Sequence, residues 1–83
     1  MKITVKLFAL LSTYLPEGAT GHEAKMEVAE GATPALLIER LRLPPKMTHL
    51  VLVNGVYVPP SERARFKLSE GDALAIWPPV AGG

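Results

Sequence analysis

Apolar and polar residues alternate in several short segments of the chain, and a period of two is typical of β-strands with one buried face. Residues 3–7 follow this pattern and predict a first strand that begins almost at Met1. Residues 24–28 repeat it and predict a second strand. Over residues 8–15, apolar side chains recur at three- and four-residue spacing, which predicts a short helix between the two strands.

The segment Gly31-Ala32-Thr33-Pro34 has the composition of a helix start. The Thr33 hydroxyl can accept a hydrogen bond from a free amide of the first turn, and Pro34 suits the first helical position because it lacks an amide hydrogen. An apolar stripe follows, and Pro44-Pro45 ends the element. The pattern predicts one main amphipathic helix from about Gly31 to Leu41.

After this helix, β-branched residues dominate. Residues 49–53 and 56–58 flank Asn54-Gly55, a pair that suits a type I′ turn because both central positions need positive φ. The sequence therefore predicts a hairpin, and Pro59-Pro60 limits its second arm to a brief edge strand. The run from Ala73 to Trp77 predicts a final strand, and its apolar character suits a central position.

These elements predict an α+β fold, a mixed sheet of about four or five strands with one main helix on one face and the first and last strands side by side. Alternation also assigns side chains to the two faces of the sheet. If Ile3, Val5 and Leu7 point toward the helix, Phe8 begins the opposite phase. In the same way, inward Val56 and Val58 place Tyr57 on the opposite face, and inward Leu74 and Ile76 place Trp77 there. Three aromatic residues on one face predict an apolar docking patch for another protein.

Composition narrows the possible functions. The chain has 83 residues, no cysteine and a formal net charge of +1. We expect a single domain, residues 1–83, which is too small to enclose a deep pocket and to act alone as an enzyme. Without cysteine there is no thiolate nucleophile or cysteine-ligated metal, and a reducing cytoplasm fits. The balanced charge predicts binding neither to nucleic acid nor to a membrane.

Few side chains carry candidate chemistry. His22 and His49 lack metal-ligand spacing and a nearby carboxylate, so we expect structural or surface roles for them, with no bound metal and no bound cofactor. The stretch Arg63-Ala64-Arg65-Phe66-Lys67 is the one basic cluster of the sequence. It can meet an acidic partner, although a solvated loop is the simpler interpretation.

The C-terminus is the strongest candidate. The sequence ends in Gly82-Gly83, and a pair of residues without Cβ atoms can pass through a channel too narrow for other residues. Pro78-Pro79 stiffens the preceding segment, so a flexible tail over residues 78–83 could extend roughly 18 Å from the domain. The terminal carboxylate becomes electrophilic when it is activated as an acyl adenylate.

The same residues carry a resemblance to a known family. Val53-Asn54-Gly55, the turn from Leu68 to Asp72, the strand from Ala73 to Trp77 and above all the ending Pro78-Pro79-Val80-Ala81-Gly82-Gly83 are similar to the MoaD/ThiS family of ubiquitin-like sulfur carriers. The resemblance is strongest to the small subunits of molybdopterin synthases. It implies a β-grasp (ubiquitin-like) roll over the whole chain.

The resemblance also implies a mechanism. In this family an E1-like adenylating enzyme of the MoeB/ThiF type uses ATP to adenylate the terminal glycine, here Gly83. Sulfur from a donor such as a cysteine desulfurase or a rhodanese then leaves a thiocarboxylate. The tail, with Gly82 next to the reactive end, enters a MoaE-type large subunit, where its sulfur is used to make molybdopterin for the molybdenum cofactor. The resemblance places partner contacts at Phe8, Tyr57, Trp77, Pro78, Pro79, Val80 and Ala81.

Other interpretations share these features. Carriers for thiamine thiazole synthesis, a tungsten cofactor or tRNA thiolation also end in Gly-Gly, as do protein-conjugating relatives. A β-grasp module without covalent chemistry would instead bind a regulatory ligand or nucleic acid. The Pro78-Pro79-Val80 element favours the molybdopterin branch. Pro59-Pro60 and the Arg63-to-Lys67 stretch are longer and more basic than in typical molybdopterin carriers, which leaves the large-subunit partner open.

Overall fold

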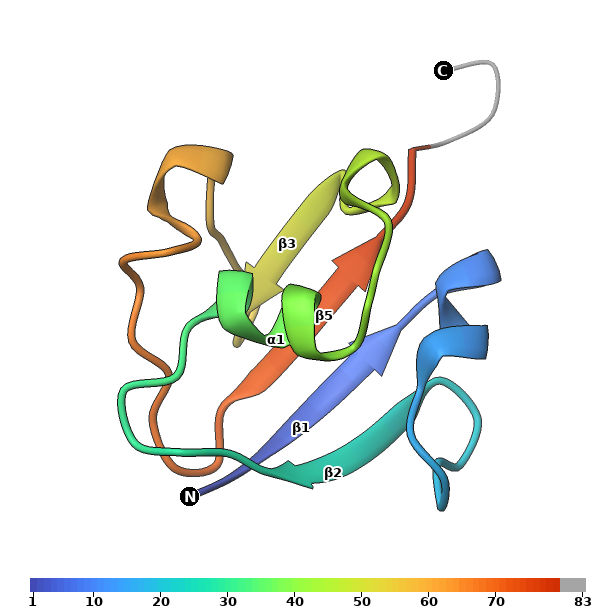
Figure 1. Ribbon diagram of the computed structural model, residues 1–83, viewed down its shortest axis with the longest axis horizontal. Helices are drawn as coiled ribbons and strands as arrows, with labels where there is room; N and C mark the ends of the chain where they lie inside the picture. Colours follow the sequence, from blue (N-terminus) through green and yellow to red (C-terminus); the bar gives the residue numbers. More distant parts are fainter. Residues whose placement is uncertain (80–83) are drawn as a thin grey trace.

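Five β-strands form one mixed sheet in the computed structural model, which describes residues 1–79 (Figure 1). The strands are β1 (Lys2–Leu7), β2 (Glu23–Glu27), β3 (Leu50–Val53), β4 (Val56–Tyr57) and β5 (Ala73–Trp77), in the order β2-β1-β5-β3-β4. β1 and β5 pair in parallel, and the other neighbours pair antiparallel. The expected mixed sheet, with its first and last strands side by side, is confirmed.

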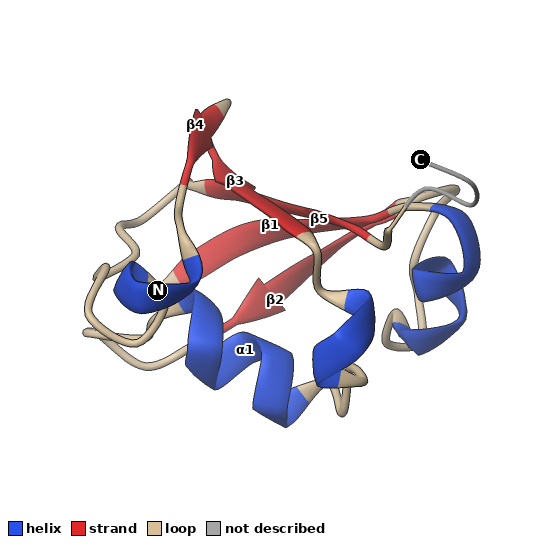
Figure 2. Ribbon diagram, turned by 90° about the horizontal axis from the view of Figure 1, so that it is seen from above, coloured by secondary structure: helices blue, strands red, loops and turns tan. Residues whose placement is uncertain are grey.

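Helices lie on one side of this sheet (Figure 2). The main helix is α1 (Pro34–Arg40), and Thr33 caps it as predicted, because its hydroxyl accepts a hydrogen bond from the Leu36 amide at 3.2 Å. Three short 3-10 helices are η1 (Ala9–Tyr14), η2 (Pro45–Met47) and η3 (Pro60–Glu62). Within residues 1–79, no helix lies over the opposite face of the sheet.

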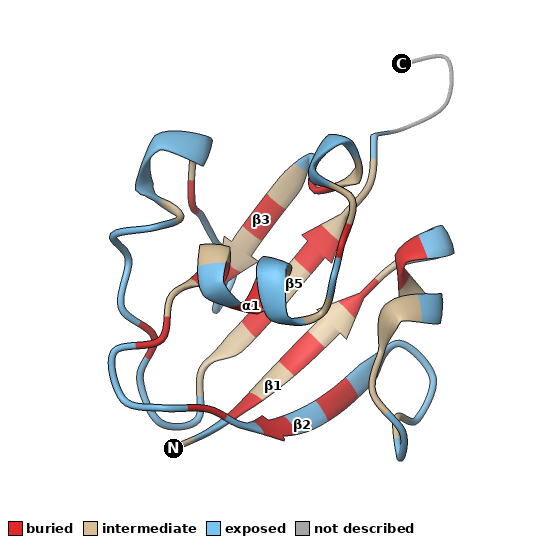
Figure 3. Ribbon diagram, viewed as in Figure 1, coloured by how far each residue is buried: buried red, intermediate tan, exposed pale blue. Residues whose placement is uncertain are grey.

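The hydrophobic core lies between the sheet and α1 (Figure 3). Leu37 from α1 and Leu11 from η1 are fully buried on this side. Burial of an aliphatic side chain of this size stabilises the fold by about 1.5–3 kcal/mol. Alternate residues of the three inner strands form much of the rest of the core: Ile3, Val5, Leu7, Val51, Val53, Leu74 and Ile76.

Two local predictions are refined by the structure. The helix predicted over residues 8–15 is the 3-10 helix η1, which begins only at Ala9. Val56 lies on the helix side of the sheet as predicted, because it pairs with the buried Val53, but it is 64% exposed, whereas Val58 is buried. β4 has only two residues and a single neighbouring strand, so Val56 has little around it to pack against.

A left-handed residue follows the C-cap of α1. Arg42 has φ of 60°, and the amide of Leu43 donates to the Ile38 carbonyl at 3.0 Å, which is the hydrogen bond of a Schellman motif. The motif turns Leu43 into the core, where it is buried. Because a side chain disfavours this backbone region and glycine does not, Arg42 is a strained position.

The Asn54-Gly55 turn forms as predicted, with φ of 51° and 82°. The Asn54 side chain also connects the hairpin to Asp72 and to Ala73, the first residue of β5. Asn54 Nδ2 donates to Asp72 Oδ1 at 2.8 Å, and Asn54 Oδ1 accepts from the Ala73 amide at 2.9 Å. The other Asp72 oxygen accepts from the Ser69 amide at 2.8 Å. We call Asn54 and Asp72 the hairpin clamp.

Candidate functional site

The uncovered face of the sheet has a charged half and an apolar half. On the charged half, β1 and β2 place opposite charges across from one another, with Lys2 facing Glu27 and Lys6 facing Glu23. The other half carries half-buried or exposed apolar side chains from β3, β4, β5 and the residue that follows β1. We call this set the apolar face: Phe8, Leu50, Leu52, Tyr57, Ala75 and Trp77.

A stack of three rings closes one end of the apolar face. The ring centroids of Phe8 and Trp77 are 4.3 Å apart, and the ring planes differ by 3°. On its other side Phe8 stacks on His22, with centroids 5.4 Å apart and planes 25° apart. An aromatic pair contributes about 0.5–1.5 kcal/mol beyond its buried area. The stack therefore holds a flat surface in place before any partner arrives.

Backbone geometry brings Phe8 onto Trp77. The Phe8 amide donates to the Ile76 carbonyl at 3.2 Å, which extends the β1–β5 ladder by one residue. Ala9 then adopts φ of 53°, and the chain leaves the strand abruptly. This left-handed conformation is uncommon for a residue with a Cβ atom, and nothing in the sequence around Ala9 indicates it.

The structure places all three predicted aromatic residues on one face. Phe8 and Trp77 touch, whereas Tyr57 is 51% exposed on β4, where it pairs with Leu52. His22, for which we expected a structural or surface role, is exposed and completes the stack. The sequence prediction of this face omitted three of its members, although the alternation along β3 and β5 would have placed them there: Leu50, Leu52 and Ala75.

The chain leaves the sheet at the end of β5. We call Trp77, Pro78 and Pro79 the tail root. The Trp77 carbonyl accepts a hydrogen bond from the His49 amide at 3.0 Å. Pro78 is half-buried and Pro79 is exposed, and neither can donate a further ladder bond. The predicted site residues Val80, Ala81, Gly82 and Gly83 lie outside the described residues. The apolar face thus ends at the root of the segment that leads to Gly83.

Arg63 changes the interpretation of the basic cluster. Its guanidinium donates from Nη1 to the Thr48 carbonyl at 2.7 Å and from Nη2 to the His49 carbonyl at 3.1 Å. Nε lies 3.5 Å from the Val58 carbonyl. Arg63 is therefore a structural tie between the two arms of the hairpin. Arg65 is exposed and fits the solvated loop that we expected.

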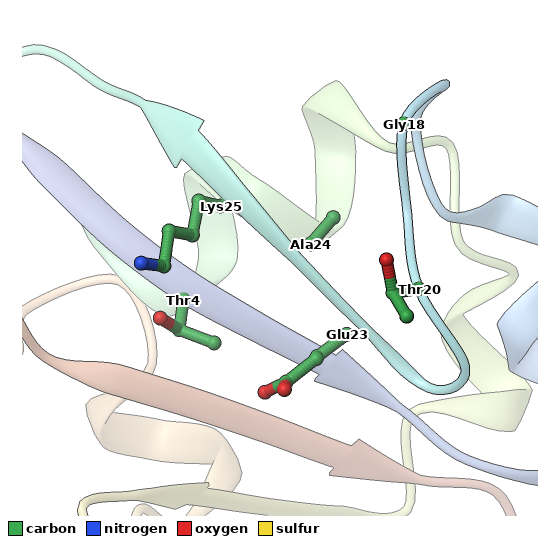
Figure 4. A pocket seen from close by; sticks show the side chains of 6 residues that line it. All are labelled: Thr4, Gly18, Thr20, Glu23, Ala24 and Lys25. Carbon is green, nitrogen blue, oxygen red and sulfur yellow. The ribbon is translucent and has the colours of Figure 1, made fainter.

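A shallow hollow of about 330 Å³ lies over the charged half of the sheet (Figure 4). It is lined by Thr4, Gly18, Thr20, Glu23, Ala24 and Lys25. Across residues 1–79, no three His, Asp or Glu side chains are grouped so that they could hold a metal ion. In the same range, no helix has the length and apolar character needed to cross a membrane. The apolar face and the tail root are the candidate site.

The strand order, the parallel central pair and the helix across one face define a ubiquitin-like β-grasp protein, as expected. The chain belongs to the ThiS family, which it matches over residues 5–83. SAMP1 from Haloferax volcanii is 25% identical, with a TM-score of 0.69 and all of both chains covered. A putative molybdopterin converting factor, subunit 1, from Pyrococcus furiosus is 27% identical, with a TM-score of 0.66 over 95% of this chain and 98% of that chain.

A further structure shares the fold alone. The complex of subunits 1 and 2 of the molybdopterin-converting factor from Helicobacter pylori contains a chain that is 16% identical, with a TM-score of 0.61 and full coverage of both chains. The comparison with curated proteins gives no match. The chain therefore has the sulfur-carrier fold of the ThiS/MoaD type, and the expected family resemblance is confirmed.

Proposed function

We propose that this protein is a sulfur carrier whose Gly83 carboxylate is adenylated and then converted into a thiocarboxylate. We further propose that it donates this sulfur as the small subunit of a molybdopterin synthase. The observation that carries the proposal is the ThiS family match, which extends to residue 83 and so includes Gly82-Gly83. The relative from Pyrococcus furiosus, named as a putative molybdopterin converting factor subunit, supports this pathway.

The chemistry needs only the terminal carboxylate from this chain. An oxygen of the Gly83 carboxylate attacks the α-phosphorus of ATP in an activating enzyme, pyrophosphate leaves, and a mixed anhydride forms. The outer sulfur of a donor persulfide then displaces AMP to give an acyl disulfide. A second thiol cleaves its S–S bond, which releases the thiocarboxylate and leaves a disulfide between the donor and that thiol. Adenylation makes the terminal carbon an electrophile, and sulfur makes the terminus a nucleophile. ATP is a substrate of the activating enzyme in this scheme, and no resident cofactor is needed.

The apolar face serves as the docking surface in this proposal. It ends at Trp77, one residue before Pro78, so a partner that covers it receives the tail from a fixed direction. Buried apolar area supplies affinity at about 25 cal/mol per Å², and positioning of the terminus supplies rate. The ring stack of Phe8 and Trp77 is already formed in the chain without a partner, which lowers the entropic cost of docking.

Several partners follow from the scheme. An E1-like adenylating enzyme of the MoeB/ThiF type activates Gly83, and a cysteine desulfurase or a rhodanese supplies sulfur. A MoaE-type large subunit provides the catalytic pocket for the final transfer. Because both the activating enzyme and the large subunit would cover the same apolar face, they bind in turn and compete with one another.

The first test concerns the terminus. The chain is incubated with an E1-like enzyme, ATP and a sulfur donor, and its intact mass is measured. We expect a product in which one terminal oxygen is replaced by sulfur. A variant without Gly83, and one extended by a single residue, serve as controls and should remain unmodified. Absence of the product with several competent activating enzymes would contradict the proposal and favour a β-grasp module without covalent chemistry.

The second test separates the pathways. The carrier is immobilised and used to capture a purified molybdopterin synthase large subunit and, separately, a thiazole synthase. We expect capture of the large subunit. Preferential capture of the thiazole synthase would move the carrier to thiamine synthesis. Thiocarboxylation without capture of either protein would favour a tungsten-cofactor or tRNA-thiolation pathway.

A further inference from the structure

The hairpin clamp contains the only side-chain amide of the protein. Asn54 is the single asparagine in the sequence, and there is no glutamine. Gly55 follows it, so no side chain shields the next backbone nitrogen from the amide carbon. We propose that Asn54 is a site of spontaneous hydrolytic deamidation and that Asp72 controls its rate. This inference is independent of the proposed sulfur chemistry.

The reaction requires only water. The Gly55 nitrogen forms a bond to Asn54 Cγ, the bond from Cγ to Nδ2 breaks, and ammonia leaves with the Gly55 amide proton. A five-membered succinimide ring results. Water then opens the ring at either of its two carbonyl carbons, which gives aspartate or isoaspartate. One water is consumed and one ammonia released overall, and nothing is oxidised or reduced.

In the folded chain the clamp restrains the reacting group at both ends. Asn54 Nδ2 is held by Asp72 Oδ1 at 2.8 Å, and Asn54 Oδ1 is held by the Ala73 amide at 2.9 Å. Attack by Gly55 requires the side-chain amide to turn and move toward the backbone nitrogen, which breaks both hydrogen bonds. Deamidation therefore proceeds through local opening of the turn, and the strength of the clamp sets how often the turn opens.

The product reverses the electrostatics of the clamp. An aspartate at position 54 places a carboxylate oxygen where Nδ2 now donates, facing Asp72 Oδ1, and two like charges at this separation repel. Isoaspartate instead adds a methylene group to the backbone of the turn. Either product loosens the hairpin from β5. Because Leu52 and Tyr57 flank this turn, the modification also disturbs the apolar face.

Intact-mass measurement tests the proposal directly, because no other side chain can give the same mass change. The purified chain is incubated at mildly alkaline pH, and the replacement of NH2 by OH is followed over time. We expect Asp72→Ala to deamidate roughly tenfold faster than the wild type, since it loses a charged hydrogen-bond partner. Glu70→Ala is the matched control, because Glu70 accepts from the Lys2 amide and not from Asn54, and it should react at the wild-type rate.

Two further measurements keep the test decisive. Urea-unfolded wild type sets the rate without any clamp, and we expect it to exceed the rate of the folded wild type. If Asp72→Ala fails to fold by circular dichroism, Asp72→Ser, which adds no second side-chain amide, replaces it, and its rate should lie between those of the folded and unfolded wild type. Equal rates in the folded wild type and the Asp72 variant, or in the folded and unfolded wild type, would overturn the proposal.

Discussion

Replacement of Arg63 with alanine should destabilise the protein much more than replacement of Arg65, although the two residues belong to the same basic stretch. Arg63 donates to the Thr48 and His49 carbonyls at 2.7 and 3.1 Å. Arg65 has an exposed side chain whose nitrogen lies 3.9 Å from a Glu62 oxygen. The pair of variants separates a structural tie from a surface charge within one loop.

The magnitude follows from these contacts. A hydrogen bond that involves a charged group contributes about 1.5–3 kcal/mol when buried, and less when water reaches it. With two such bonds from a half-buried guanidinium, Arg63→Ala should lower the free energy of unfolding by about 2–3 kcal/mol. The exposed Arg65 pair contributes less than about 0.5 kcal/mol. Since 1 kcal/mol shifts Tm by about 4–8 °C in a domain of this size, the expected losses are about 8–24 °C and less than about 4 °C.

Thermal and urea unfolding, followed by circular dichroism, measure both losses. Arg63→Lys adds a further comparison, because an ammonium group keeps the charge but cannot bridge the two carbonyls of Thr48 and His49 in the same way. We expect it to recover less than half of the stability lost in Arg63→Ala. Equal unfolding temperatures for Arg63→Ala and Arg65→Ala, or full recovery by lysine, would refute the structural tie.

Other predictions address docking, backbone strain, the terminus and the core. Trp77→Ala should weaken capture by the activating enzyme at least tenfold in titration calorimetry, on the order of a hot-spot loss, whereas Leu36→Ala on the helical side should not; unchanged affinity would exclude the docking role of the apolar face. Arg42→Gly should stabilise the fold by about 0.5–1 kcal/mol in urea unfolding, because it relieves a φ of 60°, and a loss of stability would contradict the strain. Deletion of Gly83 should abolish thiocarboxylation in the mass assay and leave Tm nearly unchanged; a product from the shortened chain would disprove the assigned terminus. Leu37→Ala should cost about 2–5 kcal/mol by the same unfolding measurement, and a smaller cost would mean that the helix contributes little to the core.

Most of the secondary structure could be predicted because its causes are local. Alternation places the strands, Thr33 and Pro34 mark the start of α1, and Asn54-Gly55 marks the hairpin turn. Alternation also assigned the aromatic residues to one face. It also assigned Val56 to the helix side correctly, but the period alone does not show how far the sheet and helix extend around an edge strand, so the exposure of Val56 could not be predicted.

The ties between elements could not be predicted, because they join residues that are distant in the sequence. The clamp joins Asn54 to Asp72 across 18 positions, and Arg63 reaches Thr48 across 15. Backbone carbonyls are the acceptors for Arg63, and every residue has one, so no residue type in the partner segment signals the contact. The left-handed Ala9 is hidden for a related reason, since tertiary contacts override its local preference.

The Phe8–Trp77 stack joins a residue that follows the first strand to a residue of the last described strand, so it has a consequence for the timing of recognition. Its two rings meet only after β1 and β5 have paired, a long-range closure that comes late compared with local turns and helices. A chain that is misfolded, or whose β5 is not yet seated, has no such ring pair to offer. A partner that docked on this ring pair, as we propose, would therefore bind only molecules in which β1 and β5 have paired, and would leave incompletely folded chains unbound.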